Sequence, residues 1–383
     1  MKYRRLGRTE LSVSEIGLGA EWFERMELDD CRAVVDECAA QGVNILDCWM
    51  AEPTVRSKIG DCLKGSRERW LIQGHIGSTH QNGQYVRSRE LPVVKEHFED
   101  LMRRLHTDYI DLGMIHYVDS PAEWDEIVSG PFIEYVRELK ARGVIRCVGL
   151  STHNPLVGMK AARSGEIDMM MFSINPAFDL MPPTEDVNDY FAEKYDASLL
   201  GVAPERTELY QLCAELELGV TVMKPFAGGR LFKAEASPFG VALTPVQCLH
   251  YALTRPAVAS VMAGFSTPAE VRAAVAYESA TDDEKDYVPI LSSAPRRAFD
   301  GKCMYCNHCK PCPVDIDIAM VNKFLDLATM QPAVPESVRE HYFSLTHTAS
   351  DCLACGGCET RCPFGVKVVE RMSQARKVFG EAK

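Results

Sequence analysis

Short apolar runs alternate with amphipathic stretches over the first 285 residues of the chain. The runs are nearly continuous in apolar character, as strands buried on both faces of a parallel sheet require. They lie at Ile16–Leu18, Asn44–Asp47, Trp70–Gly74, Tyr109–Ile115, Ile145–Gly149, Met169–Ile174, Val220–Met223 and Ser260–Ala263. The stretches with helical periodicity lie at Asp29–Gln41, Val55–Leu63, Glu90–Leu105, Ile133–Arg142, Leu156–Ser164, Glu205–Leu218, Pro245–Thr254 and Pro268–Tyr277. This series of strand–helix units predicts an α/β fold, a closed (β/α)8 TIM barrel.

Beyond residue 295 the pattern changes to two cysteine runs with helical segments between them. The first run is Cys303-x2-Cys306-x2-Cys309-x2-Cys312 followed by Pro313, and the second is Cys352-x2-Cys355-x2-Cys358-x3-Cys362 followed by Pro363. Helical patterning lies at Val314–Leu327 and Ser337–Leu345. We therefore predict a barrel domain over 1–285 and a small α-helical domain over 295–383.

Each cysteine run predicts iron–sulfur ligation. Three thiolates at i, i+3 and i+6 wrap one cuboidal cluster, and a fourth cysteine just before a proline ligates the other cluster in two-cluster ferredoxins. We expect two [4Fe–4S] clusters, one held by Cys303, Cys306, Cys309 and Cys362 and the other by Cys352, Cys355, Cys358 and Cys312. The first run departs from the common spacing, because only Lys310 and Pro311 precede its last cysteine. Two alternatives are disfavoured. Zinc sites need no third cysteine at this spacing, and disulfide frameworks are typical of small secreted domains.

Composition narrows the class of protein. The chain has 383 residues, of which 46% are hydrophobic and 25% charged, and a formal net charge of −12. These values are typical of a soluble globular protein, and the negative charge disfavours a nucleic-acid partner. We expect no membrane span and a cytoplasmic location, because the chain has neither a long apolar run nor a signal-peptide core at its N-terminus. The other cysteines are expected to be buried small hydrophobic residues: Cys31, Cys38, Cys48, Cys62, Cys147, Cys213 and Cys248.

Polar side chains stand at the carboxyl ends of six predicted strands. In a (β/α)8 barrel these ends form the face that carries the active site. The residues are Asp47, His75, His116, Ser151, Asn175 and Lys224. A single polar residue at a strand end is usually a satisfied loop residue, but this set on one rim predicts a genuine site.

Several segments resemble the aldo/keto reductase family. They are Tyr3–Gly19 (YRRLGRTELSVSEIGLG), Gly42–Asp47 (GVNILD), Asp108–His116 (DYIDLGMIH), Gly149–Pro155 (GLSTHNP) and Met223–Leu231 (MKPFAGGRL). The resemblance covers residues 1–280 and implies a barrel that reduces carbonyl groups with NAD(P)H. The cysteine-rich tail is similar to the α-helical ferredoxin domain on one branch of that family, and to the iron–sulfur subunits of fumarate reductase-type enzymes.

The family implies a catalytic tetrad of Asp, Tyr, Lys and His, in which the tyrosine donates a proton and the lysine lowers the tyrosine pKa. Asp47 matches the aspartate and His116 matches the histidine. Glu52 stands at the tyrosine position, and His75 stands at the lysine position. In one interpretation His75 is the proton donor, held by Asp47 or Glu52; in a second the site acts on another reducible bond; in a third the barrel has lost its activity. An imidazolium beside a carboxylate suits general acid catalysis, which favours the first two.

The resemblance also implies a nicotinamide cofactor with its phosphates near the last two strands. Glycine-containing turns there would bind phosphate through backbone N–H groups, although short loops can need glycine for their geometry alone. The expected cofactor contacts are Ser151, Asn175, Lys224, Gly228, Gly229, Arg230, Gly264 and Ser266. The clusters offer a second electron source, supplied by an external ferredoxin, or they only hold the small domain together.

Long segments on the same rim are predicted to be loops: Gly77–Ser88, Tyr117–Gly130 and Pro176–Pro204. Loops of this length are usually lids or docking surfaces. Their aromatic residues would line a pocket for a flat or apolar substrate or only pack the loops: Phe178, Tyr190, Phe191, Tyr195, Tyr85 and Trp124.

The sequence therefore predicts an oxidoreductase of aldo/keto reductase type that reduces a small organic substrate and carries two [4Fe–4S] clusters. Asp47, His75 and His116 would carry the acid–base chemistry, with Glu52 as a partner. The alternative is an electron-transfer protein, ferredoxin-dependent or without turnover, that uses the barrel as a scaffold.

Overall fold

The computed structural model describes residues 1–181, 183–186, 203–287, 290, 303, 309–329, 333–362 and 365–380. Contacts divide these residues into two compact units. The first contains residues 1–181, 183–185, 203–287 and 290, and the second contains Asp186, Cys303 and the described residues from 309 to 380. The domain limits of 1–285 and 295–383 stay predictions, because residues 291–302 lie outside the described ranges.

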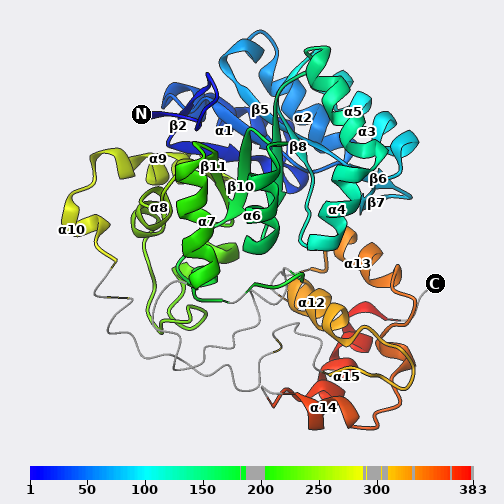
Figure 1. The fold of residues 1–383 in the computed structure, drawn as a ribbon. Coiled ribbons are helices and arrows are strands. Elements are labelled where there is room, and N and C mark those ends of the chain that lie inside the picture. Colours follow the sequence, from blue (N-terminus) through cyan, green and yellow to red (C-terminus); the bar gives the residue numbers. More distant parts are fainter. Residues whose placement is uncertain are drawn as a thin grey trace. The chain divides into compact units, whose positions relative to one another are not determined.

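Parallel strands close into a barrel in the first unit (Figure 1). They are β3 (Ile16–Gly19), β4 (Ile45–Cys48), β5 (Leu71–Ile76), β8 (Ile110–Ile115), β9 (Ile145–Thr152), β10 (Met169–Ser173), β11 (Gly219–Met223) and β12 (Val258–Gly264). Strands adjacent in this order pair with one another, and β12 pairs with β3 to close the barrel. Every strand predicted from the apolar runs is present, and the predicted barrel is confirmed.

Helices follow the barrel strands and cover the barrel from outside (Figure 1). They are α1 (Leu28–Ala40), α2 (Pro53–Leu63), α3 (Leu91–Arg104), α4 (Pro121–Ser129), α5 (Pro131–Ala141), α6 (Pro155–Ser164), α7 (Pro204–Glu215), α8 (Pro245–Leu253), α9 (Pro268–Val275) and α10 (Asp282–Lys285). Short 3-10 helices are η1 (Ala20–Arg25), η2 (Arg67–Arg69), η3 (Phe178–Leu180), η5 (Ala227–Phe232) and η6 (Ala276–Ser279). Thr244 and Thr267 cap α8 and α9 through their side chains, with proline in the first turn of each helix.

Methionine side chains fill part of the barrel interior next to glycine positions of the strands. The interior cluster includes Met114, Met169 and Met262. A Cβ atom at Gly149 would lie 2.3 Å from Sδ of Met114, and one at Gly17 would lie 2.0 Å from Cε of Met262. The glycines thus give these long, flexible side chains room in a narrow interior.

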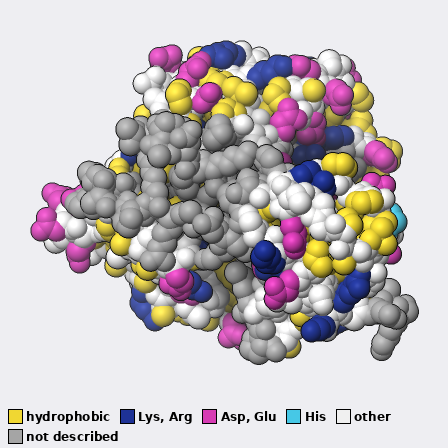
Figure 2. Space-filling view, turned by 90° about the horizontal axis from the view of Figure 1, so that it is seen from below, with side chains coloured by type: hydrophobic (Ala, Val, Ile, Leu, Met, Phe, Trp, Pro, Cys, Tyr) yellow, Lys and Arg dark blue, Asp and Glu magenta, His cyan; other side chains and the backbone are white. Residues whose placement is uncertain are grey.

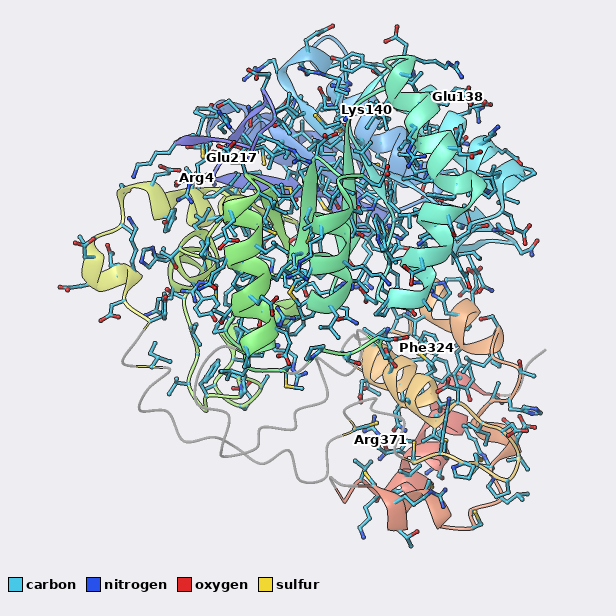
Figure 3. All side chains as sticks on the ribbon, viewed as in Figure 1. Arg4, Glu138, Lys140, Glu217, Phe324 and Arg371 are labelled. Carbon is cyan, nitrogen blue, oxygen red and sulfur yellow. The ribbon has the colours of Figure 1, made fainter. Side chains whose placement is uncertain are left out.

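A hairpin of β1 (Tyr3–Arg5) and β2 (Ser12–Ser14) precedes the barrel. Nη1 of Arg4, labelled in Figure 3, donates to the carbonyl oxygens of Leu253 and Val258 at 2.8 and 2.9 Å. The Nε group of Arg4 donates to Glu15 at 2.7 Å. The hairpin is therefore fixed at the amino end of β12, away from the rim that carries the predicted site.

Two of the predicted loops contain regular structure. Gly77–Ser88 forms a hairpin of β6 (Ser78–Gln81) and β7 (Gln84–Arg87), and the prediction of a loop there is wrong. Asn82 and Gly83 form its turn with φ of 52° and 77°, as a two-residue Asn-Gly hairpin turn requires. Tyr117–Gly130 contains α4, which the sequence pattern also missed. In Pro176–Pro204, residues 187–202 lie outside the described ranges.

The second unit is helical, as predicted. It contains α12 (Ile318–Thr329), α13 (Glu336–Phe343), η7 (Ala349–Asp351), α14 (Gly357–Arg361) and α15 (Val368–Phe379). The ring of Tyr342 stacks on that of Phe379 with 3.9 Å between centroids. Arg371 of α15 hydrogen bonds to Asn322 and Asp326 of α12, which joins the two longest helices of this unit (Figure 3).

The described surface is mixed in charge on the face that Figure 2 shows, where acidic and basic side chains are interspersed. Large exposed apolar side chains include Tyr3, Trp22, Val86, Leu156, Phe232 and Leu353. None of the described helices combines the length and the apolar character needed to cross a membrane.

Candidate active site

Three of the predicted catalytic residues meet at the carboxyl end of the barrel. Asp47 lies in β4, His75 lies in β5 and His116 directly follows β8. Nε2 of His75 lies 2.9 Å from Oδ1 of Asp47, and Nδ1 of His75 lies 2.7 Å from Nδ1 of His116. Their relative exposures are 2%, 2% and 4%. A buried carboxylate and two imidazoles in one hydrogen-bonded line can hold and move a proton.

Residues of the barrel interior also hold Asp47, at the same oxygen that His75 contacts. Nε2 of Gln73 donates to Oδ1 of Asp47 at 2.8 Å, and Oγ1 of Thr221 donates to Oε1 of Gln73 at 2.8 Å. Gln73 and Thr221 are both fully buried. The sequence-based reasoning missed this support, although an amide inside the apolar strand β5 is a signal that a buried polar partner exists.

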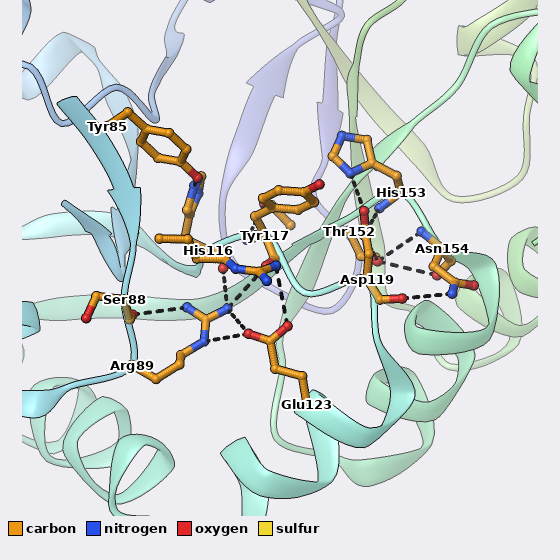
Figure 4. Close-up of polar contacts among 12 residues, drawn as sticks. Tyr85, Ser88, Arg89, His116, Tyr117, Asp119, Glu123, Thr152, His153 and Asn154 are labelled. Carbon is orange, nitrogen blue, oxygen red and sulfur yellow. Dashed lines mark hydrogen bonds and ion pairs between the residues drawn. The ribbon is translucent and has the colours of Figure 1, made fainter. Parts of the chain in front are cut away.

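Tyr85, which was expected in a loop, reaches the same site from β7. Its hydroxyl oxygen lies 2.6 Å from Nε2 of His116 (Figure 4). The ring of Trp49 stacks on that of His116 with 5° between the planes and meets Tyr85 edge to face. The Asn82-Gly83 dipeptide is the sequence signal that could have placed Tyr85 in a hairpin.

Burial favours the uncharged forms of His116 and Tyr85. Burial, together with the nearby charges of His75 and Arg89, lowers the pKa of His116 well below its ordinary value of 6.5. Burial also raises the pKa of the Tyr85 phenol to about 12. Both groups are therefore neutral near neutral pH.

Glu52, the fourth predicted catalytic residue, lies at the start of α2 instead of in this line. Its Oε2 accepts the backbone N–H of Val55 at 2.8 Å and the hydroxyl of Thr54 at 2.5 Å. Burial raises its pKa, but these hydrogen bonds outweigh burial, and the net pKa is lowered. The carboxylate that holds His75 is that of Asp47, and Glu52 caps a helix.

A second carboxylate–histidine pair lies on the neighbouring part of the rim (Figure 4). Oδ2 of Asp119 lies 2.8 Å from Nδ1 of His153, and Oδ1 of Asp119 accepts the backbone N–H of His153 at 2.6 Å. Burial lowers the pKa of His153, although Asp119 opposes this shift. Nε2 of His153 is buried without a hydrogen-bond partner among the described residues. The sequence-based reasoning did not include this pair.

Two predicted cofactor contacts use their side chains to build the rim. Oγ of Ser151 accepts the backbone N–H of Tyr117 at 3.0 Å. Nδ2 of Asn175 donates to the carbonyl oxygen of Lys224 at 2.9 Å, and Oδ1 of Asn175 accepts two backbone N–H groups at the start of η3. The first bond joins the ends of β8 and β9, and the second joins the ends of β10 and β11.

The turn after β11 leaves its backbone open to a ligand. Gly228 and Gly229 lie in η5 with φ of 67° and 83°, and a Cβ atom at either position would meet nothing within 4 Å. Arg230 follows them, and Lys224 precedes the turn. The N–H of Gly229 already donates to the carbonyl oxygen of Phe226 at 2.9 Å, so Gly228 is the position of this turn where exposed backbone lies beside two cationic residues, as suits a phosphate group.

The turn after β12 is less open. Oε2 of Glu270 accepts the backbone N–H of Ser266 at 2.7 Å and its hydroxyl at 2.9 Å. A Cβ atom at Gly264 would lie 2.9 Å from the indole ring of Trp22. The amino end of α9 therefore already holds a carboxylate, which competes with an anionic ligand at Ser266.

The aromatic residues expected to line a pocket have different positions. Trp124 and Phe178 are each 1% exposed and belong to the hydrophobic core or the helix packing beneath the rim. Tyr85 belongs to the site described above. Tyr190, Phe191 and Tyr195 lie outside the described residues.

Four of the predicted cluster cysteines line one pocket of the C-terminal unit. The lining of this pocket contains Cys312, Cys352, Cys355 and Cys358. The rest of the lining is mainly apolar and includes Ile316 and Met372. Sγ of Cys352 accepts the backbone N–H of Ala354 at 3.4 Å. This is the set of thiols that the crossed ligation predicts for one cluster.

Arg361 joins the two cysteine runs. Its Nη2 donates to the carbonyl oxygens of Cys309 and Pro311 at 2.8 and 2.6 Å. Among the described residues, no three His, Cys, Asp or Glu side chains are grouped closely enough to hold a metal ion. Of the other predicted cluster, Cys306 lies outside the described residues. The cysteines outside the two runs lie in the barrel unit, where all are buried except Cys147, which is partly buried.

Comparisons with known proteins agree with this barrel. A sequence profile of the aldo/keto reductase family matches residues 15–242. The uncharacterized oxidoreductase YqkF of Bacillus subtilis is 27% identical over 76% of this chain and 96% of that protein. The NADH-specific methylglyoxal reductase of Escherichia coli is 24% identical over 44% of this chain and 58% of that protein. The solved structure of aldo-keto reductase AKR11C1 from Bacillus halodurans in its holo form has a TM-score of 0.60 and 26% identity, over 78% of this chain and 98% of that chain.

Proposed function

Since this chain belongs to the aldo/keto reductase family, we propose that it reduces a carbonyl or comparable double bond of a small organic molecule. The observation that carries the proposal is the unbroken line of hydrogen bonds through Asp47, His75 and His116. This line ends at the rim where barrel enzymes bind their substrates. It supplies a proton store that does not depend on the tyrosine and lysine of the family tetrad.

We infer that a nicotinamide provides the electrons at the barrel. Bound there, it would supply a hydride equivalent to the substrate. Lys224, Arg230 and the backbone of Gly228 and Gly229 would hold its phosphates, because this turn is open and cationic. Glu270 at the amino end of α9 disfavours an added 2′-phosphate, which supports NADH over NADPH. One relative carries NADH in its name, which agrees with this choice.

The C-terminal unit is proposed to hold two [4Fe–4S] clusters that transfer single electrons. The pocket lined by Cys312, Cys352, Cys355 and Cys358 supports one of them, since these thiols come from both runs. A cuboidal cluster holds its cysteine sulfurs farther apart than a single metal ion does, so the thiols need not converge on one point. Cys303, Cys306, Cys309 and Cys362 would hold the other.

The four-cysteine pocket also favours a second candidate function. In it the protein accepts electrons from an external ferredoxin in the cytoplasm, and the barrel is a scaffold without turnover. Anaerobic turnover assays separate the two candidates. We expect oxidation of NADH with methylglyoxal or 4-nitrobenzaldehyde as carbonyl probes, and a loss of kcat of about 10²–10⁴-fold in His75→Gln. NADH that binds without any oxidation by these probes would favour the scaffold.

Iron and sulfide analysis of anaerobically purified protein tests the clusters. Two clusters require about eight iron atoms and about eight sulfides per chain. About four irons would support only one cluster, and stoichiometric zinc without sulfide would contradict both.

A further inference from the structure

Tyr85, His116, His75 and Asp47 form one line with successive separations of 2.6, 2.7 and 2.9 Å. Each imidazole uses both of its ring nitrogens in this line. The three inner residues are buried, whereas Tyr85 is partly exposed. Tyr85 is therefore the member of the line that a molecule entering the rim meets first.

Hydrogen-bonding rules allow the line two patterns. With Asp47 ionised and both imidazoles neutral, His75 donates from Nε2 to Asp47 and His116 donates from Nδ1 to His75. Nε2 of His116 is then an acceptor, and Tyr85 donates its hydroxyl proton to it.

One added proton reverses the direction of the two hydrogen bonds that His116 makes, one with His75 and one with Tyr85. His75 becomes an imidazolium that donates to Asp47 from Nε2 and to His116 from Nδ1. His116 then carries its proton on Nε2 and donates it to the oxygen of Tyr85. In this second pattern the hydroxyl proton of Tyr85 is free to point at a substrate.

We propose that Tyr85 is the proton donor to the substrate and that His116 and His75 resupply its proton from the ion pair of His75 with Asp47. This inference rests on the proposed function, because it assumes a carbonyl substrate at the rim. It assigns to a hairpin residue the role that the family gives to a tyrosine at the position of Glu52.

One proton moves along the line for each carbonyl group that is reduced. A bound nicotinamide would supply the hydride to the carbonyl carbon, and the carbonyl oxygen takes the hydroxyl proton of Tyr85. The oxygen of Tyr85 takes the Nε2 proton of His116, and Nδ1 of His116 takes the Nδ1 proton of His75. The line ends with neutral imidazoles beside the Asp47 carboxylate, and one proton from solvent restores the starting pattern.

The surroundings of His116 keep a resting charge off it. His116 is buried and faces His75, Arg87, Arg89 and His153, all of which disfavour a second proton on it. The carboxylate of the line, that of Asp47, lies 2.9 Å from Nε2 of His75. The passing proton therefore does not rest on His116.

The ring of Tyr85 is held in place independently of its hydroxyl. The hairpin that carries it is closed by the bond from the N–H of Ser88 to the carbonyl of Gly77 at 2.9 Å. The side chain of Thr79 donates to the carbonyl of Val86 at 2.6 Å, and Trp49 packs on the ring of Tyr85. Tyr85→Phe is therefore expected to fold normally.

Kinetics of Tyr85→Phe test the donor. With NADH and methylglyoxal, we expect kcat to fall by about 10²–10⁴-fold while KM for NADH stays within about two-fold. Tyr135→Phe on α5, where the ring lies under Lys95, is the control and should keep wild-type kcat. The dependence of kcat on the deuterium fraction of the solvent gives a further test. A curved dependence in the wild type that becomes linear in His75→Gln would support the movement of several protons in the rate-limiting step. Unchanged or increased kcat in Tyr85→Phe would overturn the donor role while leaving the reductase assignment intact.

A second measurement does not need turnover. In ¹⁵N-histidine NMR at about pH 8.5, the line requires His116 to be protonated on Nδ1 and His75 on Nε2. The Nε2 resonance of His116 should shift in Tyr85→Phe as its hydrogen bond is lost. The opposite tautomers, or a resonance that does not respond to Tyr85→Phe, would overturn the relay even if no probe is reduced.

Discussion

The carboxylate of Glu270 holds Ser266 at the amino end of α9 by two hydrogen bonds, from the backbone N–H at 2.7 Å and the hydroxyl at 2.9 Å. An anionic side chain thus occupies the end of the helix near which we propose that the adenosine part of the cofactor binds. We expect Glu270→Gln to lower KM for NADPH by about three- to ten-fold and to change KM for NADH less, because it removes a like charge. Steady-state kinetics with both cofactors measure this selectivity.

Glu68→Gln is the control for that change in net charge. Glu68 is exposed in η2, which precedes β5 and lies at the amino end of the barrel. The Glu68→Gln variant should leave the KM values for NADPH and NADH unchanged. Equal responses of NADPH and NADH to Glu270→Gln would show that Glu270 does not discriminate between them.

A fully buried ion pair anchors α7 to the rim. Nη1 of Arg206 lies 2.9 Å from Oδ1 of Asp179, and both side chains are 0% exposed. Tyr210 and Tyr251 also donate to Asp179, at 2.6 and 2.9 Å. Arg206→Met should lower the free energy of unfolding by about 3–5 kcal/mol, because it leaves a buried carboxylate without its countercharge. Urea unfolding measures the loss.

Two comparisons separate this effect from lost packing. The double variant Asp179→Asn with Arg206→Met should be more stable than Arg206→Met alone, since no buried charge remains. Arg163→Met, which removes an exposed pair with Glu208, should cost at most about 1 kcal/mol. A double variant less stable than Arg206→Met would argue for packing.

Acidification should destabilise the fold through its buried histidines. Burial lowers the pKa of His116 and of His153 below 6.5 in the folded state. The unfolded chain therefore binds more protons below pH 6.5, so this stabilisation is complete above that value and is lost as the pH falls. Each histidine adds a slope of up to about 1.4 kcal/mol per pH unit.

Urea unfolding from about pH 7.5 to about pH 5.5 measures that slope. His153→Gln should show a shallower slope than the wild type, because one of the two titrating groups is gone. Parallel slopes would exclude His153 as a contributor.

Cys355 offers a mild way to remove one of the two proposed clusters, since it is exposed and lines the four-cysteine pocket. Cys355→Ala should lower the iron content from about eight to about four atoms per chain. Cys147→Ala, a partly buried cysteine of the barrel, should keep the wild-type iron content. An unchanged iron content in Cys355→Ala would refute Cys355 as a cluster ligand.

The barrel was predictable because its strands are buried on both faces and read as apolar runs, such as Ile110–Ile115. The hairpin of β6 and β7 was not, because its residues are polar or partly exposed and show no apolar face. Helix α4 buries only Trp124 and Ile127, too few residues to give a helical period.

The inner part of the site was predictable from topology alone. Parallel strands bring their carboxyl ends to one rim, so Asp47, His75 and His116 had to lie near one another. The place of Tyr85 depends on how a hairpin folds back over the rim, which tertiary packing decides. Glu52 shows the reverse case, in which a local hydrogen bond to the backbone of its own helix withdraws a correctly aligned carboxylate from the site.

The closure of the β6–β7 hairpin at its base makes it an exchangeable module. The bond between Ser88 and Gly77 joins its two ends, and the barrel register of β5 with β8 does not involve residues 78–87. Ser78 and Thr79 are buried and Ser78 bonds to Arg56 and Trp49, so a segment of different length or sequence can be grafted between Thr79 and Ser88 without rebuilding the barrel. Tyr85, which the hairpin carries, can thereby be replaced separately from Asp47, His75 and His116. Protein engineers can test changes of the proposed reaction by replacing one short surface segment.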